Sequence, residues 1–387
     1  MDYQNIFVGG QWREPASEKR ISVECPVNRE IMGSCPEATE QDVDAAVNAA
    51  KSALAGEKWS STSGEERASH IDALSAAMKS RTDDLAVCAA QEIAAPYSFC
   101  KGQVAMARMT LKFYGQLARE YEFEERRTGY FGQVLVRKEP VGVIAAIVPF
   151  NGPLFAAMLK IGPALASGST VVLKVPVEAP LFSYVLAECI QEAAIPAGVI
   201  NILTADRDAS EYLVAHPDVN MASITGSVVA GRRVAEICGS QIKRAALELG
   251  GKSAAIVCAD AELATVVPEL AKASVINSGQ ACAAQTRILI PRNRYEETVS
   301  ALGDAYRTMK VGDPFDPETA LGPMIHDRPF ERVKACISAG LEEGARLVTG
   351  GGTPEHLKSG YFIEPTLLAD VTSDRQIARE EIFGPVV

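Results

Sequence analysis

Three residues whose types can combine in covalent catalysis stand far apart in this chain: Asn151, Glu248 and Cys282. Cys282 has small neighbours that leave room for a ligand beside its sulfur, and an accessible thiolate is a good nucleophile. Glu248 ends an apolar segment and could serve as a general base. The side-chain amide of Asn151 could donate a hydrogen bond to a developing oxyanion.

Each of these residues also has a simpler interpretation. A cysteine among small residues can belong to the core, and an asparagine after a strand can form a turn. A glutamate at a strand end can be held in an ion pair, because an unpaired buried carboxylate is costly. Taken one at a time, the three residues leave both interpretations open.

The elements that must position these residues are predicted from hydrophobic patterning. From Val141 onward, short apolar runs alternate with helical segments, which is typical of a parallel sheet buried on both faces. The predicted strands are 141–148, 170–173, 199–203, 221–224 and 245–249, and the predicted helices are 153–167, 180–194, 208–216 and 229–239. Asn151 then follows the first strand, and Glu248 lies near the end of the last.

A second α/β series is predicted after Gly250 and Gly251, so we place a domain boundary near residue 250. Its strands are expected at 253–258 and 287–290, and its helices at 261–277, 294–309 and 328–343. Cys282 lies between the first of these helices and the second strand. The expected active residues therefore belong to two different parts of the chain.

The region before the sheet is predicted to be mainly helical over 40–120, where Ser63 and Glu66 have the spacing of a capping box. Ile6–Trp12 is expected to form a hairpin with a Gly-Gly turn. Over 120–138, charged and apolar residues alternate, which predicts an exposed two-stranded ribbon. A lone ribbon normally needs something to pair with, so we interpret it as an oligomerisation arm, with a plain surface hairpin as the alternative.

Composition excludes several other classes of protein. The 387 residues include 38 basic and 49 acidic ones, and the net charge of −11 argues against nucleic acid or an anionic membrane as partner. There is no apolar run long enough for a transmembrane helix, and the N-terminus lacks signal-peptide features. The nine cysteines show no CxxC spacing and the four histidines are scattered, so we expect reduced thiols, no metal site and a cytoplasmic protein.

A nucleotide site is suggested by one turn only. No G-x-G-x-x-G string is present. Ile224–Ser227 instead follows a predicted strand and precedes a helix, whose first N–H groups could hold a pyrophosphate. An ordinary turn with a serine cap is the alternative.

Five short motifs occur in one order along the chain: Pro149–Pro153, Ile224–Ser227, Leu247–Lys252, Gly279–Cys282 and Glu381–Pro385. In type, order and approximate spacing this set resembles the aldehyde dehydrogenase superfamily, and the likeness runs from Phe7 to the last residue. The resemblance implies an α/β fold with a Rossmann-like coenzyme domain, an α/β catalytic domain and a small β oligomerisation arm. We assign residues 1–119 and 140–249 to the coenzyme-binding domain, 120–139 to the arm and 250–387 to a C-terminally incomplete catalytic domain.

The resemblance also implies roles for the active residues. Cys282 resembles the nucleophile that forms a thiohemiacetal and then a thioester. Asn151, with the backbone N–H of Cys282, resembles the oxyanion hole, and Glu248 the base that hydrolyses the thioester. Lys160 resembles a proton-relay lysine, with an exposed helix lysine as the alternative.

The implied coenzyme is NAD or NADP. Lys174 resembles the contact to the adenosine ribose, Ser227 the contact to the pyrophosphate, and Glu381 the contact to the nicotinamide ribose, with Phe383 near that ring. The remaining expected cofactor-binding residues are Pro149, Phe150, Gly226 and Gly250. Val177 stands where many NAD-preferring relatives have a glutamate, and Glu178 is one residue later. The choice between NAD and NADP therefore stays open.

Other departures widen the alternatives. Residues 205–210 lack the usual glycines, Phe150 replaces a common tryptophan, and the chain ends at Val387, before the usual end of family chains. A CoA-acylating aldehyde dehydrogenase is one alternative, although Glu248 argues against it; an inactive truncated member and a coenzyme-independent esterase are others. A homodimer or homotetramer is expected, and the sequence does not specify which aldehyde is the substrate.

Overall fold

The computed structural model describes all 387 residues and divides them into two compact units. The first unit comprises Met1–Val23, Gly33–Ala86 and Lys101–Glu248. The second comprises Glu24–Met32, Val87–Cys100 and Leu249–Val387. The second unit thus begins its long segment at Leu249. The assignment of coenzyme binding to one unit and catalysis to the other stays a proposal.

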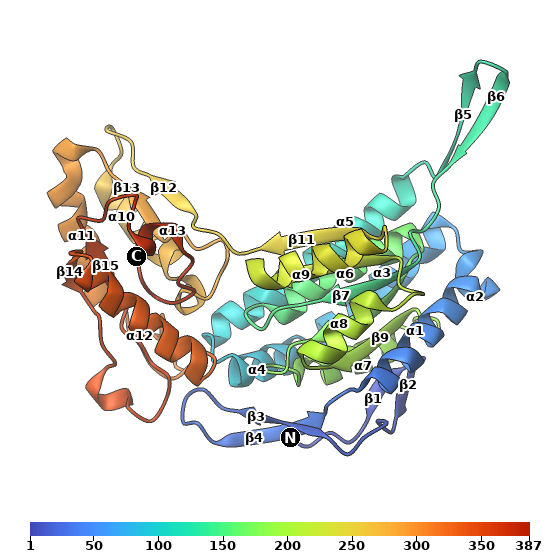
Figure 1. The fold of residues 1–387 in the computed structure, drawn as a ribbon, viewed down its shortest axis with the longest axis horizontal. Helices are drawn as coiled ribbons and strands as arrows, with labels where there is room; N and C mark the ends of the chain where they lie inside the picture. Colours follow the sequence, from blue (N-terminus) through green and yellow to red (C-terminus); the bar gives the residue numbers. More distant parts are fainter. The chain divides into compact units, whose positions relative to one another are not determined.

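The first unit is built on a seven-stranded sheet with the order β11-β10-β7-β8-β9-β1-β2 (Figure 1). Its strands are β7 (Val143–Ile147), β8 (Thr170–Val175), β9 (Ile200–Thr204), β10 (Met221–Gly226), β11 (Arg244–Leu249), β1 (Ile6–Val8) and β2 (Gln11–Arg13). Strands β10, β7, β8 and β9 are parallel neighbours, as the alternating apolar runs predict. Their carboxyl ends therefore lie at one edge of the sheet.

The N-terminal hairpin extends this sheet, which the sequence did not predict. Gly9 and Gly10 both have positive φ angles, 67° and 76°, and form the tight turn between β1 and β2. Strand β1 then pairs antiparallel with β9 through Phe7 and Ile202. The hairpin itself was predicted, but a pairing partner about 195 residues away leaves no local signal.

Helices cover both faces of the sheet. One face carries α1 (Glu40–Ala55), α8 (Arg207–Ala215) and α9 (Val228–Ser240), which share an apolar core with the strands. A second group consists of α3 (Gly64–Ser80), α6 (Pro153–Ser167) and α7 (Phe182–Glu192). Helix α6 packs on β7 and β8, α7 packs on β9, and α3 packs on both of these helices. Helix α6 has the bounds predicted from its apolar run, because Pro153 starts it and Gly168 (φ 84°) ends it.

Strand β11 corrects one prediction. We expected residues 245–249 to be buried like the other strands, but most of β11 is exposed. β11 is the edge strand of the sheet, so it has a neighbour on one side only. Its apolar composition is therefore not explained by the core of the first unit.

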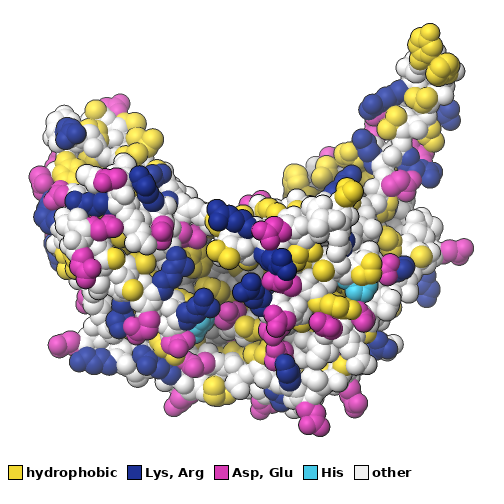
Figure 2. Space-filling model, viewed as in Figure 1, with side chains coloured by type: hydrophobic (Ala, Val, Ile, Leu, Met, Phe, Trp, Pro, Cys, Tyr) yellow, Lys and Arg dark blue, Asp and Glu magenta, His cyan; other side chains and the backbone are white.

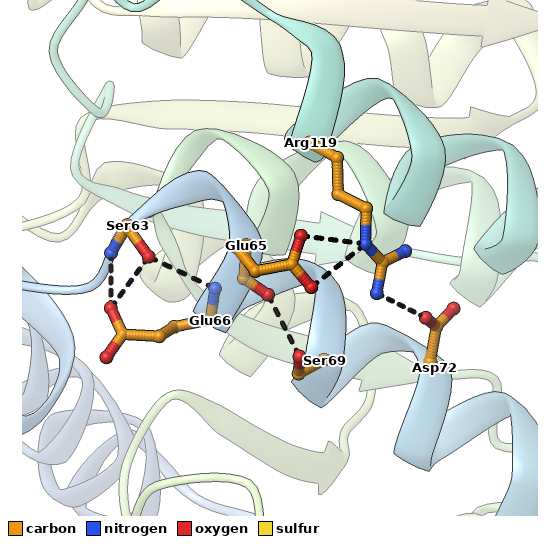
Figure 3. A network of polar contacts seen from close by, with 6 residues as sticks. All are labelled: Ser63, Glu65, Glu66, Ser69, Asp72 and Arg119. Atoms are coloured by element: carbon orange, nitrogen blue, oxygen red, sulfur yellow. Dashed lines mark hydrogen bonds and ion pairs between the residues drawn. The ribbon is translucent and has the colours of Figure 1, made fainter.

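A polar network joins helix α3 to the long helix α5 (Tyr97–Glu120) (Figure 3). The other helices of this region are α2 (Glu57–Ser60) and α4 (Thr82–Glu92). The predicted capping box is present: the Ser63 N–H donates to Glu66 Oε2 at 2.7 Å, and Ser63 Oγ accepts from the Glu66 N–H at 3.2 Å. Arg119 of α5 binds Glu65 and, at 2.7 Å, Asp72 of α3. These ion pairs hold α5 in a fixed register along α3.

The predicted ribbon consists of β5 (Glu124–Gly129) and β6 (Gly132–Arg137), which pair only with each other and project from the first unit (Figure 1). Tyr130 and Phe131 at its tip are 95% and 99% exposed, and the tip is apolar in Figure 2. A second hairpin, β3 (Arg20–Glu24) and β4 (Ile31–Pro36), was not predicted.

The second unit is also α/β. Strand β12 (Ala254–Ile256) pairs parallel with β13 (Arg287–Leu289), and helices α10 (Leu263–Ser274), α11 (Tyr295–Arg307) and α12 (Asp327–Glu342) follow the predicted order. The antiparallel pair β14 (Arg346–Thr349) and β15 (Leu367–Ala369) and the short α13 (Gln376–Arg379) were not predicted. No helix of the chain is both long and apolar enough to cross a membrane.

Candidate active site

The sheet of the first unit brings several predicted residues to one edge. Asn151 follows β7, Lys174 lies in β8 and Ser227 follows β10. Because β7, β8 and β10 are parallel, their carboxyl ends meet at the same edge, which is where open α/β sheets bind ligands. The βα turns after Phe150 and Gly226 therefore belong to one surface.

Asn151 is held by the start of helix α6. It is half-buried, Gly152 is the N-cap and Pro153 is the first helical residue. A Cβ on Gly152 would lie 3.1 Å from Oε1 of Gln103, so the loop that carries Asn151 rests against helix α5. This packing constrains the backbone directly after Asn151.

Lys160 is buried in the first unit, which rules out the exposed helix lysine. Its ammonium donates to Ser223 Oγ of β10 at 3.1 Å. Burial lowers the pKa of Lys160 to about 8, and the Glu248 carboxylate partly opposes that shift. A lysine that titrates near neutrality can take up or release a proton during turnover.

Glu248 is exposed on the edge strand β11 and forms no ion pair. The interpretation as an ion-paired strand-end residue is therefore wrong. The carboxylate is close enough to Lys160 to influence its pKa. An unpaired, accessible carboxylate is available to act on water.

Two carboxylates act on Lys174, and only one of them, that of Glu178, was expected from the sequence. Burial lowers the pKa of Lys174, while the carboxylates of Glu178 and Asp206 oppose this shift. Asp206 is the N-cap of α8, where its Oδ1 accepts from the Ala209 N–H at 3.1 Å. Asp206 follows β9, the third parallel strand along the chain, and this position could have identified Asp206 from the sequence.

Ser227 is the N-cap of α9, and its Oγ accepts from the Ala230 N–H at 3.2 Å. The serine cap is therefore present, as the simpler interpretation expected. The first N–H groups of α9 have no helical partners and point out of the same turn. A phosphate at this position is compatible with the cap, and the pyrophosphate contact stays a prediction.

The second unit carries Cys282 on a loop with unusual backbone geometry. Asn277, Ser278 and Gly279 have φ angles of 52°, 55° and 71°, so the helix predicted over 261–277 ends early, at Ser274. Buried side chains hold the loop: Ser278 Oγ donates to the Gly322 carbonyl at 2.8 Å, and Gln280 Oε1 accepts from the Ile325 N–H at 3.1 Å. These left-handed residues were not predicted.

Cys282 itself is exposed, so the interpretation as a core cysteine is wrong. Burial raises the pKa of other thiols, to about 12 for Cys100 and Cys189. Cys258 is the one other cysteine classed as exposed, and all nine cysteines are free. An accessible sulfur on a rigidly held loop is the geometry that a nucleophile needs.

Glu381 and Gly250 lie against each other in the second unit. The Gly251 N–H donates to Glu381 Oε1 at 3.3 Å, and burial raises the pKa of the Glu381 carboxyl. A Cβ on Gly250 would come within 2.0 Å of Glu381 Oε2. A side chain at position 250 would therefore clash with the Glu381 carboxylate, which explains why this position is a glycine.

The segment after Glu381 packs on the loop that carries Cys282. Phe383 has a φ of 61°, and the next residue, Gly384, places its carbonyl where a Cβ on Gly279 would lie, at 1.9 Å. The loop that carries Cys282 and the loop that carries Phe383 are therefore in direct contact. Two motifs about 100 residues apart form one structural piece.

Residues 12–387 match the family described as Aldehyde dehydrogenase family. The chain belongs to this family. Among curated relatives, geranial dehydrogenase from Castellaniella defragrans is 42% identical over 389 residues, covering the whole chain and 81% of that protein. Aminoaldehyde dehydrogenase 1 from Pisum sativum is 36% identical, covering 99% of the chain and 78% of that protein.

Solved structures agree with the predicted fold class. The aldehyde dehydrogenase of Mycobacterium tuberculosis in complex with NAD+ superposes with a TM-score of 0.97 at 42% identity, covering the whole chain and 80% of that structure. A variant of aldehyde dehydrogenase C from Pseudomonas syringae, complexed with NAD+ and octanal, gives a TM-score of 0.96 at 38% identity. This match covers 99% of the chain and 79% of that structure. The predicted family, α/β fold and NAD(P)-dependent oxidation of aldehydes are confirmed.

Proposed function

We propose that this aldehyde dehydrogenase oxidises its substrate to a carboxylic acid through a covalent intermediate on Cys282. The thiolate adds to the carbonyl carbon, and the oxyanion of the thiohemiacetal accepts hydrogen bonds from Asn151 and the Cys282 N–H. The observation that carries this proposal is the exposed sulfur of Cys282 on a loop fixed by Ser278 and Gln280.

Residues of the first unit are suited to hold the coenzyme. Lys174 offers a cation at the sheet edge, and the turn at Gly226 and Ser227 offers free N–H groups for phosphate. In the second unit Glu381 and Phe383 are proposed for the nicotinamide end. Bound NAD+ or NADP+ would supply the hydride acceptor for the oxidation, which would leave a thioester on Cys282.

Hydrolysis then completes the reaction. We assign Glu248 as the base that takes a proton from water, so that the resulting hydroxide attacks the thioester carbon and the bond to sulfur breaks. One aldehyde, one water and one oxidised coenzyme thus give one acid, one reduced coenzyme and one proton. We propose that Lys160 exchanges a proton with Glu248, because the Glu248 carboxylate acts on the pKa of Lys160.

Membership of the family does not identify which aldehyde this protein oxidises. The relatives' names include geranial, a succinoyl-pyridine semialdehyde, betaine aldehyde and aminoaldehydes.

We infer a cytoplasmic protein because all nine cysteines are free, as is usual in a reducing compartment. Some relatives are named as peroxisomal or chloroplastic.

The test compares two single-cysteine variants. Cys282→Ala should abolish reduction of NAD+ or NADP+ by an aldehyde panel, measured by nicotinamide absorbance. Cys258→Ala removes the other exposed thiol and should retain full turnover. Adding coenzyme A should not raise the rate, because water is the proposed acyl acceptor. Turnover in Cys282→Ala would refute the proposed nucleophile, and dependence on coenzyme A would favour the acylating alternative.

A further inference from the structure

Two side chains beside Glu381 carry nucleophiles that the proposed reaction does not use. The Gly251 N–H donates to Glu381 Oε1 at 3.3 Å, and Nη2 of Arg332 in α12 donates to the Glu381 carbonyl at 2.6 Å. Lys252 directly follows Gly251 in the chain. Cys336 lies four residues after Arg332, on the same face of α12. An amine and a thiol thus approach one residue from two elements of the second unit.

The charge on Lys252 responds to this thiol. Among the charged groups that act on Lys252, the Cys336 thiolate has the largest effect, ahead of Arg287 and Glu381. Because Coulomb interactions weaken with distance, the sulfur is a near neighbour of the amine. Both residues are half-buried, so the long lysine side chain lies along the protein instead of extending into solvent.

Lys252 is suited to react as an amine. Burial lowers its pKa to about 8, while the Cys336 thiolate partly opposes this shift. About half of the Lys252 side chains are therefore neutral at pH 8, and the neutral amine is the form that adds to carbonyl groups. An exposed lysine with its ordinary pKa is almost entirely protonated at this pH. No hydrogen bond contributes to the shift of the Lys252 pKa.

The sulfur of Cys336 is also available. It forms no disulfide, and it packs against an apolar core that contains Val333 and Ile337 of the same helix. This packing fixes the helix face on which the sulfur lies. Aldehydes condense with amines to Schiff bases, which thiols can then attack, so the substrates of this family are themselves reagents for such a pair.

We propose that Lys252 and Cys336 form a second covalent site for aldehydes, in which the carbonyl carbon of one small aldehyde joins the two side chains. The Lys252 amine adds to that carbon, and loss of water gives an imine. The Cys336 sulfur then adds to the imine carbon, and the thiol proton passes to nitrogen. One aldehyde, one amine and one thiol thus give one N,S-acetal and one water, with no oxidation or reduction. Because both groups are half-buried, the site favours aldehydes as small as formaldehyde.

The adduct would lie beside Glu381, which is proposed for the nicotinamide end of the coenzyme. Its effect on turnover therefore rests on the proposed function, whereas the covalent site does not. The bridge ties the turn at Gly251 to α12 and so restrains Glu381 between them. Treatment with formaldehyde should raise the KM for NAD+ by about tenfold, which is the effect of one lost hydrogen bond to a charged group.

Mass spectrometry of a digest tests the site without turnover. Cys282→Ala, which removes the proposed nucleophile, is incubated with formaldehyde and digested. The peptides that contain Lys252 and Cys336 should be joined, with a gain equal to the mass of one carbon atom, because formaldehyde is added and water is lost. Adding Cys336→Ala or Lys252→Gln should abolish the joined pair. Cys25→Ala is the matched control, since Cys25 is the other half-exposed cysteine, and it should retain the pair.

The outcomes separate this inference from the proposed function. Absence of the joined pair from folded Cys282→Ala protein would refute the covalent site. In the kinetic assay, with a larger aldehyde as substrate, Cys336→Ala should abolish the rise in the KM for NAD+ after formaldehyde treatment. A rise of the same size in that variant would show that the bridge does not act on the coenzyme. If the chain reduces no coenzyme with any aldehyde, the proposed function fails, and the joined pair still decides the site.

Discussion

At the scale of single residues, the structure changes how three predicted side chains are understood. Cys282 and Glu248 are accessible rather than buried or ion-paired, and Lys160 is buried rather than exposed. The residue types were recognisable from motifs, but their exposure was not. Burial depends on which elements pack over a residue, and a motif of five residues carries no such information.

Coenzyme choice is decided at this scale. The Glu178 and Asp206 carboxylates act on Lys174, so a 2′-phosphate bound near this lysine would meet two negative charges. We predict a preference for NAD+ over NADP+. Glu178→Gln and Asp206→Asn should each raise the NADP+/NAD+ ratio of kcat/KM by about tenfold; asparagine retains the helix cap at 206.

The control for this prediction is Glu192→Gln, which removes an exposed carboxylate of helix α7. The NADP+/NAD+ ratio of kcat/KM for this variant should equal that of the parent chain. Steady-state rates with each coenzyme at a fixed aldehyde concentration provide the measurement. Equal rates with both coenzymes in the parent chain, or an unchanged ratio in both variants, would show that these carboxylates do not face the ribose.

At the scale of elements, hydrophobic patterning predicted the order of strands and helices from β7 to α12. For α6 it predicted both the first and the last residue of the helix. It missed the β14–β15 pair and the pairing of β1 with β9, because such partners are distant in sequence. It also extended one helix to 277, through a segment where Asn277 and Ser278 adopt positive φ. Only contacts with distant loops explain why those residues accept that conformation.

The contact between the two loops of the second unit leads to a prediction about Gly279. Gly279→Ala would place a Cβ against the Gly384 carbonyl at a φ of 71°, so it should lower the free energy of unfolding by about 1–3 kcal/mol. It should also slow turnover, because it displaces the loop that carries Cys282. Chemical denaturation and nicotinamide absorbance give the two readouts.

Gly239→Ala is the matched control for this prediction. Gly239 lies within helix α9, and an added Cβ would meet no atom within 4 Å. Alanine should therefore stabilise the protein by about 0.5–1 kcal/mol. If both alanine variants unfold at the same denaturant concentration, the close approach of the two loops does not matter for stability.

At the scale of the whole molecule, the open question is what covers the β5–β6 hairpin. The sequence predicted the ribbon because charged and apolar residues alternate, and the structure shows it without a third strand. Tyr130 and Phe131 at the tip contact each other with ring centroids 5.0 Å apart, and both are almost fully exposed. We propose that a second copy of this chain covers them.

This assembly prediction is tested by the double substitution Tyr130→Ser and Phe131→Ser. Light scattering after gel filtration should give a dimeric or tetrameric mass for the parent chain and a smaller mass for the variant, with little change in melting temperature. Ile31→Ser removes another strongly exposed apolar side chain and should leave the mass unchanged. An unaltered mass in the tip variant would favour the plain surface hairpin.

The central claim is that an acyl group resides on Cys282 until Glu248 activates water. Rapid mixing of Glu248→Gln with NAD+ and an aldehyde tests it most directly, followed by mass spectrometry of the peptide that contains Cys282. We predict a burst of reduced coenzyme stoichiometric with the enzyme, then a stall, with the acyl mass on Cys282. Steady turnover at the parent rate, with no acyl group on that peptide, would contradict the account.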